Sequence, residues 1–389
     1  MGPVEPVNER SRSVTIETPF DRRTIAAIAE EYGLGKLVSV QPAPIGWARR
    51  TNHQTNLLVD AGRGKSILRL DELRGELDVK RELDLLLFLR KHGFPCPQPL
   101  ADRKSRLYHD LDGHCVIAYK HIDGRQVHVD RLALPQIENI GRVLADLHVI
   151  GKGYKKGVEN RFSFERVAER YAEIRGRLPG YFKKITRTLD EEVEYLGNYL
   201  EGKLPKGVIH GDLHDASVLL KGEKVVGLLD FEAGCRGKFI FDLATAVNAV
   251  CFTRGRYDLK RFEALIAGYD NARTLSLAEW DAFPNELRFS ALRLTVTRLS
   301  EVVSMPGAEK GLAEITEERE LAPAGIAAED PIDDERHRAV RGFQDFFDRL
   351  SILRRERDGG MEPMLLAMAT GYDYRRYQKV KQVEKKESK

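Results

Sequence analysis

The stretch VIHGDLHDASVLL at residues 208–220 constrains the fold more than any other part of the chain. Its first apolar run ends in His210, Gly211 and Asp212, and a second apolar run follows. The later segment LLDFE carries another carboxylate, Asp230, at the end of a further β-like run. Short apolar runs bounded by turn residues are typical of buried strands. The pattern predicts a small β structure that presents two acids, with the glycine giving the backbone room to turn.

Two acids on adjoining strands suit phosphoryl transfer. This reaction needs one carboxylate to orient the attacking hydroxyl and accept its proton, another to hold magnesium on the phosphates, and a cation beneath them. The turn KGEK joins two of the strands, so we expect Asp212 and Asp230 to lie at one mouth of the same hairpin. The structural alternative is that each acid only forms a turn or caps a strand end, where Asp is common.

Residues from about 37 to 122 combine strand patterns with one helix. The runs in TNLLVDAGRGKSILRL and in LYHDLDGHCVIAYKHI are interrupted by GRG and DG, so each segment predicts a hairpin. Between them, ELDVKRELDLLLFLRKHG has helical apolar spacing and ends at Gly93. A short amphipathic helix precedes this region, with Asp21 as its cap and Gly33 at its end.

The rest of the chain is mainly helical in pattern. Apolar periodicity predicts helices over LPQIENIGRVLADLHVIG and over roughly 164–201, 240–270, 278–303 and 334–356. Strands at 207–210, 217–220 and 225–230 interrupt this region as one small β patch. A β-rich half followed by a helical half predicts two lobes, and a cleft between two lobes is a suitable place to hold a nucleotide.

The expected domain bounds follow from these patterns. We expect a flexible tail over 1–19, an N-lobe over 20–122, a C-lobe over 123–370 and a basic tail over 371–389. The link between the lobes lies near Ile122. An acidic segment at 304–333, rich in Ala and Pro, predicts a surface insertion in the C-lobe.

Composition excludes several partners and sites. The net charge of +3 over 389 residues gives no reason to expect nucleic acid or an anionic membrane. Four widely spaced cysteines form no metal-binding or disulfide pattern, and no apolar run is long enough to span a bilayer. We therefore expect a cytoplasmic protein with a small-molecule partner, while the sequence does not indicate an oligomeric state.

The segments HGDLHxxxVLL, LLDFE and DLA resemble the aminoglycoside phosphotransferase and choline kinase superfamily, whose members are bilobal relatives of protein kinases. KRELDLLLFLRKHGFPCPQPL, IGRVLADLH and LRFSALRLTVTRLSE are similar to the phosphotransferase-type homoserine kinases within it. The resemblance covers roughly residues 20–303. It implies an α+β protein-kinase-like fold with a small antiparallel β N-lobe, one N-lobe helix and a mainly helical C-lobe.

The resemblance also implies roles for single residues. Asp212 matches the catalytic base, Asp230 the magnesium ligand, and Asp242 an acid that braces the catalytic loop. His210 is expected to tie that loop to Asp242 through its ring. The residues implied to bind ATP are Arg69 on a strand, its partner Glu82, and the hinge Tyr119, Lys120, His121 and Ile122. The alternative to nucleotide binding is that Arg69 extends into solvent and Glu82 faces water.

The implied activity is ATP-dependent phosphorylation of a small-molecule hydroxyl, with homoserine as the leading acceptor. Homoserine needs an arginine for its carboxylate and an acid for its amine. Arg293 and Arg298 are the candidates for the first, with only one expected to point inward, and Glu232 is the candidate for the second. Other amino alcohols, choline, sugars and aminoglycosides remain alternative acceptors.

Two departures from the superfamily pattern bear on activity. Ser217 stands where the superfamily has an asparagine that holds a metal or braces the base, and a hydroxyl is the poorer ligand. The segment GWARRTN has only Gly46 in place of the expected glycines and carries bulky Trp47 and charged Arg49 and Arg50. The two arginines could bind phosphate or belong to a solvated turn. A nucleotide-binding pseudokinase without turnover is therefore the rival from another class. Retention of Asp212 and Asp230 favours an active kinase, with Ser217 as a catalytic and metal-binding residue.

Overall fold

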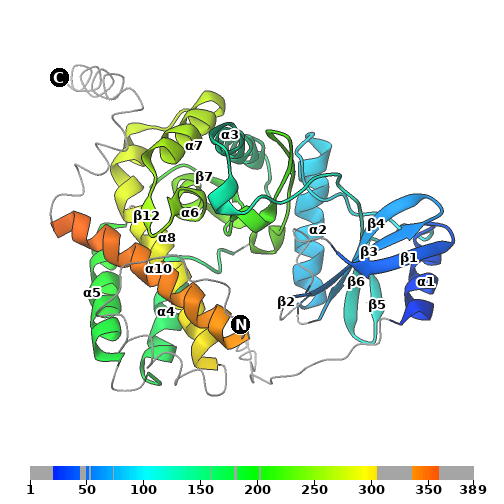
Figure 1. The fold of residues 1–389 in the computed structure, drawn as a ribbon, viewed down its shortest axis with the longest axis horizontal. Helices are drawn as coiled ribbons and strands as arrows, with labels where there is room; N and C mark the ends of the chain where they lie inside the picture. The colour runs from blue at the N-terminus through cyan, green and yellow to red at the C-terminus, as the bar shows by residue number, and fades with distance from the viewer. Residues whose placement is uncertain are drawn as a thin grey trace, which may run out of the picture.

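The computed structural model describes residues 21–43, 50–51, 54–72, 74–157, 159–178, 182–200, 203–304 and 335–358. These residues form a smaller β-rich lobe and a larger helical lobe, as predicted (Figure 1). The expected tails, the insertion after Ser304, and Trp47 and Arg49 of the GWARRTN segment lie outside the described residues. No described helix is both long enough and apolar enough to cross a bilayer.

The N-lobe is built on an antiparallel six-stranded sheet with the order β1-β3-β4-β6-β5, and β2 pairs with β3. Its strands are β1 (Leu37–Pro42), β2 (Arg50–Thr51), β3 (Gln54–Ala61), β4 (Gly64–Asp71), β5 (His109–Leu111) and β6 (His114–Lys120). Both predicted hairpins are confirmed, with Ala61 opposite Gly64 and Leu111 opposite His114. The second turn is tight because Asp112 and Gly113 both have positive φ.

Two helices cover the two faces of this sheet. Alternate residues such as Val59 and Leu68 pack against α1 (Arg22–Glu31), whereas Leu58 and Ile67 face the core that includes α2 (Glu76–Lys91). Asp21 caps α1 by accepting a hydrogen bond of 2.7 Å from Thr24. The helix α2 stands between the sheet and the larger lobe (Figure 1).

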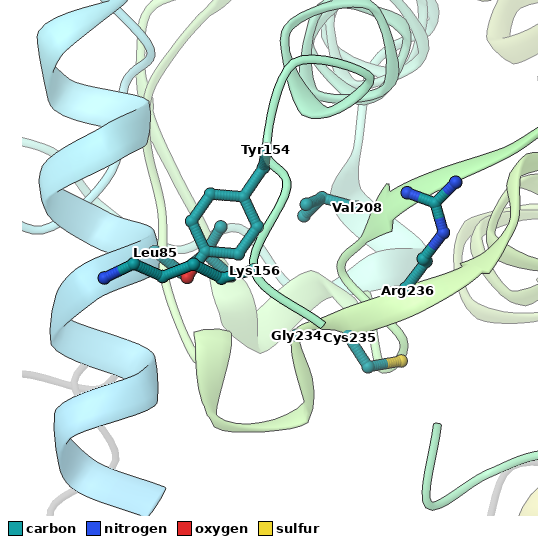
Figure 2. Close-up of a pocket in the computed structure, with 7 residues that line it drawn as sticks. All are labelled: Leu85, Tyr154, Lys156, Val208, Gly234, Cys235 and Arg236. Atoms are coloured by element: carbon teal, nitrogen blue, oxygen red, sulfur yellow. The ribbon is translucent and has the colours of Figure 1, made fainter. Parts of the chain in front are cut away.

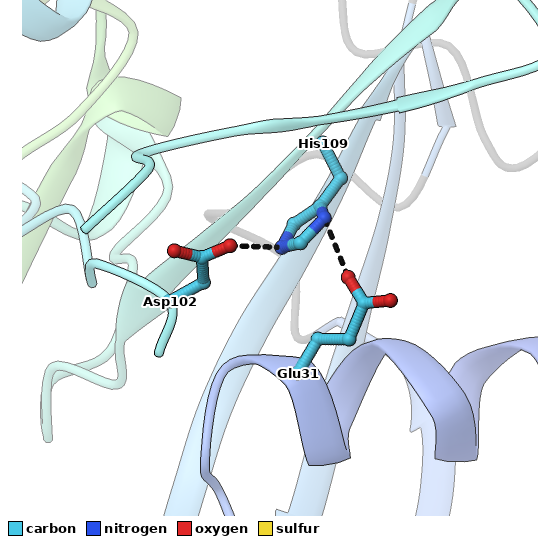
Figure 3. Close-up of side chains that lie close together, drawn as sticks. All are labelled: Glu31, Asp102 and His109. Atoms are coloured by element: carbon cyan, nitrogen blue, oxygen red, sulfur yellow. Dashed lines mark ion pairs between the residues drawn. The ribbon is translucent and has the colours of Figure 1, made fainter. Parts of the chain in front are cut away.

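An ion-pair network joins α1 to the edge strand β5, although the two elements are far apart in the sequence (Figure 3). His109 lies 2.7 Å from Glu31 through Nδ1 and 3.3 Å from Asp102 through Nε2. The two ring nitrogens face different acids, so the imidazole bridges Glu31 and Asp102. Arg106 also contacts Asp102 at 2.8 Å and supplies a positive charge. These ion pairs join α1 to the edge of the sheet.

The C-lobe contains more helices than the sequence pattern indicated. The described helices are α3 (Leu134–Gly151), α4 (Phe164–Arg175), α5 (Lys183–Tyr199), α6 (Phe239–Val250), α7 (Leu259–Ala272), α8 (Leu277–Ser304) and α10 (Glu335–Asp358). The single helix predicted over 164–201 was wrong, because α4 ends at Gly176. The helix predicted over 240–270 was also wrong, since the hairpin of β11 (Phe252–Thr253) and β12 (Arg256–Tyr257) divides it.

The predicted single β patch consists of two separate pairs. β7 (Lys206–Ile209) pairs with β10 (Cys235–Lys238), and β8 (Val218–Lys221) pairs with β9 (Lys224–Leu228). The expectation that Asp212 and Asp230 lie on one hairpin was therefore wrong. Asp212 follows β7, which pairs with the strand after Asp230 instead of with β9.

The core of the C-lobe positions these strands. The helices α3 and α7 approach so closely that a Cβ on Gly141 would lie 2.0 Å from the carbonyl oxygen of Leu265. A Cβ on Gly268 would lie 1.8 Å from that of Glu138, so both crossing points require glycine. The same core holds α6 and β7, and α10 packs along α8.

Candidate active site

The loop after β7 carries Asp212, the predicted catalytic base. Gly211 has a φ of +80°, and a Cβ there would lie 2.8 Å from the carbonyl oxygen of Ala233. Only glycine therefore permits the sharp turn and the close approach of the two loops. Asp212 follows at once, with its side chain 39% exposed.

Asp242 braces this loop from α6. Its carboxylate accepts hydrogen bonds from the backbone N–H groups of His210 (2.7 Å) and Gly211 (2.8 Å). It also lies 3.0 Å from Nε2 of His148, a buried residue of α3. Burial opposes ionisation of Asp242, but the hydrogen bond and charge of His148 hold its pKa below the usual value. The predicted bracing geometry is present, and His148 was not predicted.

The ring of His210 makes a different contact from the one expected. Its Nε2 lies 2.6 Å from the carbonyl oxygen of Leu229, directly before Asp230. The expectation that the ring binds Asp242 was wrong, because the backbone of His210 already supplies that hydrogen bond. The ring instead joins the two loops that carry the two acids.

Asp212 is paired with a buried cation from α8. Nη1 of Arg293 donates to Oδ1 of Asp212 at 2.6 Å, and the Arg293 side chain is only 2% exposed. Burial opposes ionisation, but the Arg293 guanidinium, with His214, holds the pKa of Asp212 well below its usual range. The acid is therefore ionised throughout the neutral range.

Asp230 lies in the left-handed region, with φ 60° and ψ 48°, at the start of the turn that follows β9. Burial raises its pKa above the usual value, although His214 and Arg69 act in the opposite direction. Among the described residues, no cation forms an ion pair with it. A partly buried carboxylate without such a partner fits a divalent cation, which prefers oxygen ligands. His214 influences both acids, so both lie near one imidazole.

A buried ion-pair network lies on the N-lobe side of the site. Nη1 of Arg69 in β4 donates to Glu82 in α2 at 3.0 Å, and both side chains are nearly inaccessible. Nη1 of Arg74 reaches the other oxygen of Glu82 at 2.5 Å and lies 3.2 Å from Asp71. Burial opposes ionisation of Glu82, and Arg74 and Arg69 lower its pKa. The structure brings Arg69 and Glu82 together as expected and adds Arg74.

Glu232 connects the lobes. Its Oε2 accepts a hydrogen bond of 2.8 Å from Gln54 in β3 and lies 3.6 Å from Arg74. Its position as a ligand for a substrate amine stays a prediction, but in this state its carboxylate faces two N-lobe side chains.

Ser217 has no exposed surface. Its hydroxyl donates to the carbonyl oxygen of His214 at 2.7 Å and accepts from the N–H of the same residue at 3.1 Å. A hydroxyl has one hydrogen and two lone pairs, so this turn uses most of its capacity. The geometry disfavours the predicted catalytic and metal-binding role of Ser217 and favours a loop-closing role. Asp215 is also engaged, since it accepts from the N–H of Val129 at 2.7 Å.

The predicted hinge occupies the end of β6 and the link to the C-lobe. Tyr119 is buried opposite Ile67, and Lys120 is exposed. His121 and Ile122 follow the strand, and the chain then pairs with β8 through Arg125 and Leu220. Adenine binding by this segment stays a prediction.

A model of the phosphotransferase enzyme family matches residues 48–280, more than half of the chain. The chain belongs to the phosphotransferase enzyme family. The match runs from before β3 to the start of α8 and includes Arg69, Glu82, Asp212 and Asp230, whereas Arg293 lies beyond its end.

Curated relatives of this phosphotransferase include homoserine kinases. The one from Methylobacillus flagellatus is 31% identical over 272 residues, which cover 70% of this chain and 82% of the relative. The one from Caulobacter sp. is 30% identical over 330 residues, covering 84% and 96%. The sequence of this phosphotransferase is thus like those of homoserine kinases.

Solved structures share the fold of this phosphotransferase. A microcompartment-associated aminopropanol kinase superposes with a TM-score of 0.61 at 19% identity, over 87% of this chain and 98% of that one. An amicoumacin kinase solved in complex with AMP-PNP, Ca²⁺ and Ami superposes with a TM-score of 0.59 at 15% identity, over 85% of this chain and 94% of that one. The predicted α+β, protein-kinase-like architecture is confirmed.

The two arginines proposed from the sequence for the acceptor differ in position in this phosphotransferase. Arg293 points to Asp212, whereas Arg298 is exposed and pairs with Glu301 at 2.8 Å on the same helix. The expectation that only one would point inward agrees with this geometry. Sequence reasoning missed Arg74 and Gln54, because no local pattern distinguishes them from surface residues.

Proposed function

We propose that this phosphotransferase transfers the γ-phosphoryl group of ATP to the hydroxyl of homoserine. The observation that carries the proposal is Asp212, which is ionised, partly exposed and fixed by Arg293 on a loop braced by Asp242. The similarity to homoserine kinases supports the acceptor. Choline, other amino alcohols and aminoglycosides have less support from the sequence.

The residues of the cleft fit a nucleotide with magnesium. Asp230 offers a carboxylate that no described cation neutralises, and Arg69 offers a buried cation fixed by Glu82. When bound, magnesium neutralises phosphate charge and aligns the transferred group. In our proposal Asp230 holds the metal, Arg69 faces the phosphates, and the segment from Tyr119 to Ile122 receives adenine.

The role of Asp212 follows from its environment. A carboxylate with a strongly lowered pKa is a weak base but a firm hydrogen-bond acceptor. Phosphoryl transfer passes through a loose transition state, in which positioning of the hydroxyl matters more than early proton removal. In our proposal Asp212 therefore orients the acceptor hydroxyl, and takes its proton as the new bond to phosphorus forms.

The four cysteines, Cys96, Cys115, Cys235 and Cys251, are free and buried, which supports the expected reducing, cytoplasmic setting.

ATP consumption should be measured with homoserine, choline, ethanolamine, 3-aminopropan-1-ol and an aminoglycoside, with magnesium varied. We expect homoserine to give the highest kcat/KM and activity to depend on magnesium. A higher kcat/KM for another acceptor would overturn the assignment of homoserine, and no turnover on any of them would overturn the kinase assignment.

A further inference from the structure

The acceptor pocket needs a cation that is free to bind a substrate carboxylate, and this inference rests on the proposed amino-acid acceptor. Two of the arginines near the acids are already engaged, Arg293 with Asp212 and Arg74 with Glu82. The exposed Arg298 pairs with Glu301. None of these three is an available anchor in the present geometry.

Two cavities adjoin the loop after Asp230. The smaller, about 10 Å³ in volume, is lined by Leu85, Tyr154 and Cys235, among others, and has room for about one water molecule (Figure 2). The larger, about 490 Å³, is within the size range of small-molecule sites. It opens between α2, one face of α4 and the loop of Phe231–Ala233, and its lining includes Asp78, Arg81, Glu82, Arg161, Glu169 and Glu232.

Arg161 lies in the wall of this larger cavity, beside the ring of Phe162. Its guanidinium carbon is 5.1 Å from the centroid of the Phe162 ring, and that of Arg293 is 3.6 Å from the same centroid. Because Arg293 donates to Asp212, the shared ring places Arg161 close to the acid that would orient the hydroxyl. In homoserine only three carbons separate the carboxylate from the hydroxyl, so one molecule needs its two recognition sites near each other.

Within the described part of the chain, Arg161 makes no hydrogen bond or ion pair. Burial lowers its pKa, and the neighbouring Arg74 and Arg293 act in the same direction, whereas Glu232 and Asp212 oppose them. The Arg161 residue is exposed to solvent, and a guanidinium without a carboxylate partner is available to bind an anion. The planar fork of its donors suits a carboxylate in two parallel hydrogen bonds.

We propose that Arg161 binds the α-carboxylate of an amino-acid acceptor and thereby sets the preference for an amino acid over the matching amino alcohol. The acceptor would place its carboxylate on Arg161 in the wall of the larger cavity and extend past the edge of that cavity, so that its hydroxyl meets Asp212, which is not one of the lining residues. Phe162 and Arg293 would form the wall between the two contacts.

The test compares homoserine with 3-aminopropan-1-ol, which is the same molecule without its carboxylate. Steady-state kinetics should be measured for the wild type, Arg161→Ala and Arg161→Lys. Arg175→Ala serves as the matched control. It also removes one positive charge, here from α4, but Arg175 forms an exposed ion pair with Asp190 of α5 and does not line the larger cavity. Circular dichroism and ATP affinity report whether each variant keeps its fold.

We expect Arg161→Ala to raise the KM for homoserine by about 10- to 100-fold, as for loss of a charged hydrogen bond. The kinetics with 3-aminopropan-1-ol and the KM for ATP should stay within about twofold, and Arg161→Lys should lie between the wild type and Arg161→Ala. An unchanged KM for homoserine, an equal loss on both acceptors, or a rise in the KM for ATP alone would overturn the inference. A wild type that prefers 3-aminopropan-1-ol would overturn both the assignment of homoserine and the role of Arg161. A wild type that prefers homoserine, with Arg161 variants that keep this preference, would overturn only the role of Arg161.

Discussion

Nη1 of Arg293 lies 2.6 Å from Oδ1 of Asp212, so a buried cation holds the acid that orients the acceptor in our proposal. Asp212 still has 39% of its side chain exposed. A carboxylate has two oxygens and can accept from the guanidinium and from a substrate hydroxyl together. The pair therefore fixes the carboxylate without removing it from the cleft.

Asp212→Asn should lower kcat by about 10²- to 10⁴-fold, the range for loss of a positioned acid–base group. The amide keeps the shape of the side chain but cannot accept the proton. Calorimetry should show nearly unchanged Mg–ATP affinity, because the nucleotide contacts are elsewhere in the cleft. A near-normal kcat in this variant would rule out the role of Asp212.

Arg293→Met should make activity more sensitive to acid. The guanidinium lowers the pKa of Asp212, so its removal lets burial raise that pKa, and the acid limb of the kcat/KM profile should move to higher pH. The pairing stabilises the ionised form, so its contribution to stability is present above the ordinary pKa of Asp and is lost as pH falls. Arg298→Met is the matched control on the same helix, and its acid limb should not move. Identical limbs in wild type and Arg293→Met would contradict this coupling.

The local parts of the site were predictable, because the motif fixes their geometry over a few residues. Gly211 must turn the chain sharply, and Asp242 must satisfy backbone donors of that turn. The hairpins of the N-lobe were predictable for the same reason, since turn residues between alternating runs determine them.

Contacts between distant segments were not predictable. Gln54 and Glu232 are 178 residues apart and meet only because α2 packs against both lobes. The same holds for Arg293, whose helical pattern predicts a buried face without saying which acid it meets. The pairing of β7 with β10 likewise depends on the chain returning after Asp230, which no local spacing encodes.

Glu82→Gln should destabilise the N-lobe, because Arg69 and Arg74 then stay buried without their shared carboxylate. Loss of one partner from a buried pair costs about 3–5 kcal/mol of the free energy of unfolding. The control is Arg187→Ala, which breaks an exposed pair with Glu191 at 2.9 Å and should cost less than about 1 kcal/mol. Urea titrations of both variants measure the difference, and equal losses would show that Glu82 is not a structural ion-pair partner.

Asp230→Ala should weaken nucleotide binding only when magnesium is present. The carboxylate is the metal ligand in our proposal, so its loss leaves the ion with few fixed oxygens. Calorimetry with ATP should be run with and without magnesium. We expect the magnesium-dependent gain in affinity to disappear, while the affinity for free ATP stays near that of the wild type. A full magnesium-dependent gain in the variant would assign the metal to another residue.

Ser217→Ala separates the two roles that this residue could have. Its hydroxyl exchanges two hydrogen bonds with the backbone of His214, and the side chain has no exposed surface. Removal of the hydroxyl leaves the N–H and the carbonyl oxygen of His214 without these partners, which should cost about 1–3 kcal/mol of stability. If Ser217 only closes the loop, kcat should fall modestly while the magnesium concentration for half-maximal activity stays constant.

A metal ligand would give a different result, because its loss weakens magnesium binding directly. The half-maximal magnesium concentration would then rise several-fold in Ser217→Ala, and saturating magnesium would restore most of the rate. Asp258→Ala provides a comparison, since Asp258 caps α7 by accepting from the N–H of Arg261 at 3.2 Å, and its loss costs about 0.5–2 kcal/mol without touching the site. We expect both variants to share a lowered melting temperature and a normal magnesium requirement. That result would assign Ser217 to the loop through its backbone contacts and leave Asp230 as the proposed metal ligand.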